Sequence, residues 1–88
     1  MVEIVLPKLG MYDGDATLIE WLVDDGGAVA AGDPLFLVET DKIESEIEAD
    51  DDGLLVQLQA PGFRAPIGTV IGYVVSTPEE RERLGAAR

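Results

Sequence analysis

The chain repeats its own pattern of turns at an offset of 36 residues. Residues 22–38 (LVDDGGAVAAGDPLFLV) align with residues 58–74 (LQAPGFRAPIGTVIGYV), and the turn glycines of the two segments coincide. The matched glycines are Gly26 with Gly62 and Gly32 with Gly68. Short apolar segments that alternate with glycine turns, repeated in two halves, restrict the fold to one in which two similar β-rich halves pack together.

Eight short segments between the turns have the composition of β-strands. They span residues 2–6, 16–23, 28–31, 35–40, 43–49, 54–59, 63–65 and 69–76. Eight strands joined by glycine turns, with an internal repeat, predict an all-β fold of the two-sheet antiparallel sandwich or flattened barrel type.

Residues 38–50 (VETDKIESEIEAD) contain the most regular pattern in the chain. After Lys42, small or apolar residues alternate with acidic ones, which indicates a strand with one buried and one solvated face. Asp41 and Lys42 are predicted to form the turn before this strand, and pairing of Thr40 with Ile43 would place Glu39 opposite Glu44. In that register the inward face consists of Phe36, Val38, Ile43, Ser45 and Ile47. Lys42, one of two lysines in the chain, is therefore predicted at an exposed hairpin tip.

The second predicted strand, residues 16–23, is apolar on both faces. Strict alternation divides its residues into two sets, with Thr17, Ile19, Trp21 and Val23 on one face and Ala16, Leu18 and Leu22 on the other. Both faces are therefore expected to be at least partly covered, and Trp21 is predicted to be a core residue rather than a platform for a ligand.

The composition excludes several classes of function. The 88 residues make one small domain without cysteine or histidine, so it has no disulfide framework and lacks the commonest general base and metal ligand. The net charge of −12 disfavours binding to nucleic acid or to an anionic membrane. The acidic run at residues 50–53 lacks the alternating ligands and the distal glutamate of a calcium loop. No metal site and no catalytic residue are predicted.

The two ends of the chain carry further signals. The N-terminus shows no signal-peptide pattern, and no segment approaches the roughly 20 apolar residues of a membrane span. We therefore expect a cytoplasmic location, or a matrix location if a transit peptide has been removed. Residues 1–76 are predicted to form the domain, and residues 77–88 a tail or the start of an interdomain linker. In this tail Thr77 is a candidate helix cap, Pro78 a first helical residue and Gly85 a helix stop.

Five motifs follow one another along the first 75 residues. They are LPKLGM (6–11), EWLV (20–23), AGDPLFLVETDKIE (31–44), EAD-DDG (48–53) and PIGTVIG (66–72). In this order and spacing the sequence resembles the lipoyl domains, of the biotinyl/lipoyl-attachment family, in the dihydrolipoyl acyltransferase components of 2-oxo acid dehydrogenase complexes. The resemblance implies a barrel-sandwich hybrid in which two four-stranded antiparallel sheets are related by a pseudo-twofold axis.

The resemblance also implies a swinging-arm carrier without catalytic residues of its own. Lys42 occupies the place of the lysine that carries lipoate in amide linkage, and Glu39 and Asp41 are expected to help the modifying enzyme recognise it. Gly10, Met11 and Tyr12 are expected to form a loop that partner enzymes recognise. The implied partners are a lipoate ligase or lipoyl transferase, a thiamine-diphosphate-dependent 2-oxo acid dehydrogenase and dihydrolipoamide dehydrogenase.

Two alternatives share the predicted fold. Biotin carriers also bear a tip lysine, but methionines flank it in that family, whereas Asp41 and Ile43 flank Lys42 here. The second alternative is an unmodified hairpin domain that acts as an interaction module, although such domains often lack the lysine. The chain departs from the lipoyl pattern at Gly26-Gly27, Ile43, Asp50 and Phe63, which bears on the choice of partner rather than on the carrier role.

Overall fold

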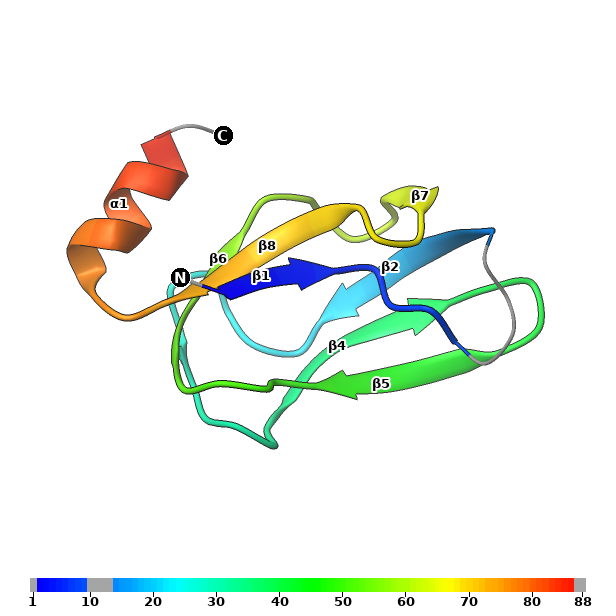
Figure 1. Ribbon diagram of the computed structural model, residues 1–88, viewed down its shortest axis with the longest axis horizontal. Coiled ribbons are helices and arrows are strands. Elements are labelled where there is room, and N and C mark those ends of the chain that lie inside the picture. The colour runs from blue at the N-terminus through cyan, green and yellow to red at the C-terminus, as the bar shows by residue number, and fades with distance from the viewer. Residues whose placement is uncertain (1, 10–13, 87–88) are drawn as a thin grey trace.

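The computed structural model describes residues 2–9 and 14–86 and contains two antiparallel sheets. The eight strands are β1 (Val2–Val5), β2 (Asp15–Trp21), β3 (Ala28–Val29), β4 (Pro34–Glu39), β5 (Glu44–Glu48), β6 (Gly53–Gln57), β7 (Arg64–Pro66) and β8 (Val70–Val75). One sheet has the strand order β1-β8-β6-β3 and the other β5-β4-β2-β7 (Figure 1). The prediction of a two-sheet, all-β sandwich is confirmed.

The internal repeat is present in the backbone hydrogen bonds. Leu22 N donates to Leu35 O at 2.9 Å, and its counterpart Leu58 N donates to Ile71 O at 3.0 Å. The glycine turns correspond as well, since the φ angles of Gly26 and Gly62 are 84° and 95°. Glycine adopts such positive φ angles without the steric cost of a Cβ. The two halves therefore have the same local geometry, and the two strand orders are equivalent under the repeat.

The core lies between the two sheets. Its completely buried side chains come from both layers and from the connection after β1: Leu6, Leu18, Phe36, Val38, Leu55 and Ile71. Burying each such aliphatic or aromatic side chain contributes about 1.5–3 kcal/mol, so this layer supplies most of the stability of a domain this small. Trp21 packs against the cluster, with its ring centroid 5.6 Å from that of Phe36, and its Nε1 donates to Gln59 O at 2.9 Å.

The predicted division of β2 into two faces is wrong at Trp21. The register between β2 and β4 shifts between Leu18 and Glu20, so Leu18 lies opposite Val38 and Trp21 lies opposite Phe36. Cross-strand partners point to the same face of a sheet, and a bulge adds one residue to the alternation. Trp21 therefore shares the face of Leu18. Trp21 is predicted to be a core residue, and the structure shows it partly buried and packed against the core rather than within it.

A short helix, α1 (Pro78–Ala86), follows β8 and contacts β6 and β8. Thr77 caps it as predicted, since the Glu80 amide donates to Thr77 Oγ1 at 3.2 Å. The predicted stop at Gly85 is wrong by a small margin, because the helix continues to Ala86. That this segment begins a linker stays a prediction. Within residues 2–9 and 14–86, no helix has the length and apolar character needed to cross a membrane.

Candidate functional site

The connection between β4 and β5 forms a tight turn at one end of the molecule. The start of β1 and the end of β8 lie at the opposite end (Figure 1). Glu39 pairs with Glu44, and Thr40 N donates to Ile43 O at 2.8 Å, as the predicted register requires. This leaves Asp41 and Lys42 at the apex of the turn, both exposed. The predicted hairpin with an exposed lysine at its tip is thus present.

Thr40 fixes the backbone beneath Lys42. It is the buried polar residue of the described core, with 7% of its surface exposed. Its Oγ1 accepts from the amides of Lys42 at 3.4 Å and Ile43 at 3.3 Å, and donates to Ile43 O at 3.4 Å. Threonine hydroxyls commonly bond to backbone amides two or three residues further on. The lysine is therefore presented by an ordered turn, although its own side chain is free to extend.

Sequence reasoning did not assign a role to Thr40. The usable signal was a threonine two residues before the apex lysine, since this spacing suits a hydroxyl that closes the turn.

Thr40→Val tests this role, because valine keeps the shape of threonine but lacks the hydroxyl. We expect the free energy of unfolding to fall by about 0.5–1.5 kcal/mol, the usual net value of a hydrogen bond. We also expect faster amide hydrogen exchange at Lys42 and Ile43, measured by NMR. Thr40→Ser is the matched control, since it keeps the hydroxyl and should keep both amides protected. Equal exchange rates in the two variants would show that the hydroxyl does not order the turn.

The predicted inward position of Ile43 is wrong. Its side chain is 47% exposed, whereas Ser45 and Ile47, which lie in β5, are half-buried. Ile43 precedes β5 and lies in the turn itself, outside the alternation of the strand. The tip consequently presents an apolar side chain directly beside Lys42.

The charges around the tip are mostly negative. Glu39, Asp41 and Glu44 are exposed next to Lys42. In the described part of the chain the recorded ion pair joins Arg64 to Asp15 at 3.6 Å, and Lys42 takes part in none. The same part of the chain has no group of histidine, cysteine or carboxylate side chains arranged to hold a metal ion. The site therefore offers an amine with open access from solvent, carried on a rigid support and surrounded by carboxylates.

The structure brings together three of the six predicted site residues, and the other three lie outside the residues that it describes. Lys42, Asp41 and Glu39 share the tip, as their positions in one hairpin require. Gly10, Met11 and Tyr12 lie outside the described residues, so their role in recognition stays a prediction. The roles of Glu39 and Asp41 toward a modifying enzyme also stay predictions.

Comparison with known proteins gives consistent similarities. Residues 2–74 match the Biotin_lipoyl family, described as "Biotin-requiring enzyme". One relative is the dihydrolipoyllysine-residue acetyltransferase component of the acetoin cleaving system of Cupriavidus necator, to which the chain is 38% identical over 75 residues. The match covers 84% of this chain and 20% of that protein. The chain is also 33% identical over 88 residues to the corresponding component of the pyruvate dehydrogenase complex of Zymomonas mobilis. This match covers 98% of this chain and 20% of that protein.

A solved structure shows the same architecture. It is the solution structure of the lipoyl domain of the 2-oxoglutarate dehydrogenase complex from Azotobacter vinelandii, with a TM-score of 0.71 and 25% identity. The similarity covers 86% of this chain and 98% of that domain. The chain spans only about a fifth of the length of the two acetyltransferase components.

Proposed function

This chain belongs to the Biotin_lipoyl family as a lipoyl carrier domain, and from that premise we propose that Lys42 is the residue that carries the lipoyl group. The observation that supports the assignment is the exposed amine at the apex of the β4–β5 turn. The other lysine of the chain, Lys8, precedes β2 and does not lie in a hairpin turn. A tip lysine is accessible to the active site of a modifying enzyme, whereas the strands behind it stay folded.

In this role Lys42 forms one amide bond with lipoate. Its amine attacks the carboxyl carbon of an activated, adenylated lipoate, the C–N bond forms, AMP leaves and the amine loses a proton. Because the described tip residues include no histidine or cysteine, we propose that activation is left to the modifying enzyme. When attached, lipoate supplies a disulfide that accepts electrons and an acyl group. The domain itself contributes placement and a high effective concentration of that group.

The carboxylates around Lys42 suit recognition rather than catalysis. Glu39 and Glu44 face each other across the strands, an arrangement that typically costs about 0.2–1 kcal/mol. We propose that this negative cluster steers basic surfaces of the modifying enzyme and of partner enzymes toward the tip. The relatives belong to pyruvate, acetoin and 2-oxoglutarate systems, so we propose as partners a 2-oxo acid dehydrogenase or a related enzyme and a dihydrolipoamide dehydrogenase.

The test is the intact mass of the purified chain after two parallel reactions. One contains lipoate ligase, ATP and lipoate, and the other biotin ligase, ATP and biotin. We expect a single lipoyl adduct in the first reaction and unchanged mass in the second. A biotin adduct alone would assign the chain to the biotin carriers, and no adduct in either reaction would favour an unmodified interaction module.

A further inference from the structure

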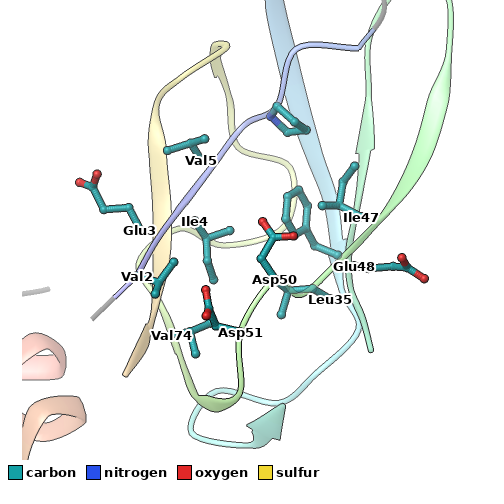
Figure 2. Close-up of a pocket in the computed structure, with 12 residues that line it drawn as sticks. Val2, Glu3, Ile4, Val5, Leu35, Ile47, Glu48, Asp50, Asp51 and Val74 are labelled. Carbon is teal, nitrogen blue, oxygen red and sulfur yellow. The ribbon is translucent and has the colours of Figure 1, made fainter. Parts of the chain in front are cut away.

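A hollow of about 160 Å³ lies between the two edge strands, away from the lysine tip. Strand β1 is at the edge of one sheet and β5 at the edge of the other, so the sandwich is open between them. Figure 2 shows Ile4 and Val5 on one side of this opening and Ile47 on the other, with Asp50 between them. We name this opening the edge groove and define it by Val2, Ile4, Val5, Ile47, Asp50 and Asp51.

The β1 side of the edge groove is an apolar strand edge with little protection. Val2 and Val5 are 39% and 37% exposed, although both are large apolar residues. Proteins usually guard an edge strand with charged side chains, because its free backbone groups can pair with another strand. Strand β5 has such protection in Glu44, Glu46 and Glu48, whereas β1 carries the single charge of Glu3. The unguarded edge of β1 is therefore suited to strand addition.

The rim of the edge groove is acidic. Glu3, Glu48, Asp50 and Asp51 line it, and the other described lining residues are apolar or proline. Two other acidic residues in nearby loops have structural roles, because Asp33 accepts from the Ala30 amide at 3.0 Å and Asp52 from the Ala31 amide at 2.7 Å. In contrast, Asp50 and Asp51 are exposed at the mouth of the groove. Their charges face solvent where a basic side chain can approach them.

We propose that the edge groove binds an extended segment of a partner protein in which lysine or arginine alternates with apolar residues. The segment adds to the free edge of β1, one apolar side chain enters the hollow, and basic side chains meet Asp50 and Asp51. A dry cavity of about 150 Å³ holds one benzene molecule, so a hollow of about 160 Å³ suits a single branched side chain. A second copy of the chain is disfavoured, since each copy carries a charge of −12. The proposal does not depend on the modification of Lys42.

The test is an NMR titration of the ¹⁵N-labelled 88-residue chain with a synthetic peptide, acetyl-Lys-Val-Lys-Leu-Lys-Val-Lys-amide. We expect amide shifts concentrated in residues 2–5 and 47–51. A peptide of equal charge with serine in place of its apolar residues should bind at least about tenfold more weakly. The double substitution Asp50→Asn with Asp51→Asn should weaken binding by about tenfold. The matched control, Glu20→Gln with Asp24→Asn, removes the same charge away from the groove and should change binding by less than about twofold.

Four results would overturn the proposal. Shifts spread over all acidic surfaces, or centred on residues 40–43, would show that the groove is not the site. Equal binding of the serine peptide would show that no apolar side chain enters the hollow. Equal losses in the two double variants would reduce the interaction to general charge attraction. Finally, dimers in analytical ultracentrifugation that vanish on Val5→Lys would identify a second copy as the occupant.

Discussion

Replacing Lys42 with alanine is expected to abolish lipoylation and to leave the free energy of unfolding within about 0.5 kcal/mol of the parent value. The side chain is exposed at the apex of the turn and makes no hydrogen bond or ion pair with residues 2–9 or 14–86. Its backbone amide makes the contact with Thr40. Alanine preserves that backbone contact and removes the amine. Intact mass after reaction with lipoate ligase measures the first effect, and urea unfolding measures the second.

The chain offers a matched control, because it contains only one other lysine. Lys8→Ala removes the same charge from another exposed position and should leave lipoylation complete. Lys42→Arg adds a second control, since it keeps a positive charge at the tip but offers no amine that forms the amide. Modification of the Lys42→Ala chain, or its loss in Lys8→Ala, would move the attachment site to Lys8. Unfolding of Lys42→Ala would reveal a structural role for the lysine that the turn geometry does not show.

Much of the fold can be predicted from the sequence, because the glycine turns and the alternation of strand residues indicate the same strands. The glycine turns at Gly26 and Gly62 are set by backbone conformations that glycine adopts readily, so the repeat in the sequence became a repeat in the structure. The alternation after Lys42 fixed the register of β4 and β5, because a slip by one residue would bury the glutamates. This register is also what placed Lys42 at the tip.

The errors occurred where alternation stops being a guide. A bulge between Leu18 and Glu20 moves Trp21 to the opposite face from the one predicted. No residue type in this part of the sequence signals a bulge. The sequence pattern of β5 extends back to Ile43 and predicts an inward side chain, but the strand begins only at Glu44, and Ile43 is 47% exposed in the turn. Periodicity describes one strand, whereas burial depends on what the rest of the fold places above it.

The edge groove escaped prediction for a related reason. Its two sides, β1 and β5, are more than 35 residues apart in the sequence and belong to different sheets. Val2 and Val5 look like ordinary strand residues, and Asp50 and Asp51 look like ordinary turn residues. Only the packing of the two sheets brings them to one opening.

Replacing Phe36 with alanine is expected to destabilise the domain by about 3–5 kcal/mol, the largest change among these stability variants. Phe36 is 1% exposed and packs its ring against Trp21, so the substitution removes apolar contacts and leaves a cavity in the middle of β4. Small domains have free energies of unfolding of about 5–15 kcal/mol, so the substitution removes a large part of the total. Urea unfolding followed by circular dichroism, together with Trp21 fluorescence, measures the change. Leu22→Ala is the control, because that side chain is 38% exposed and its loss should cost far less.

Phe36→Ala also separates two ways in which lipoylation can fail. Phe36 lies on the strand that leads directly into the lysine turn, so the turn exists only while β4 is folded. We expect lipoylation of Phe36→Ala to fall in proportion to the unfolded fraction and to recover on cooling toward the temperature of maximum stability, because Lys42 is still present. Lys42→Ala should stay unmodified at every temperature. If Phe36→Ala were lipoylated equally well when unfolded, the modifying enzyme would read the sequence around Lys42, and the rigid tip would not be needed for attachment.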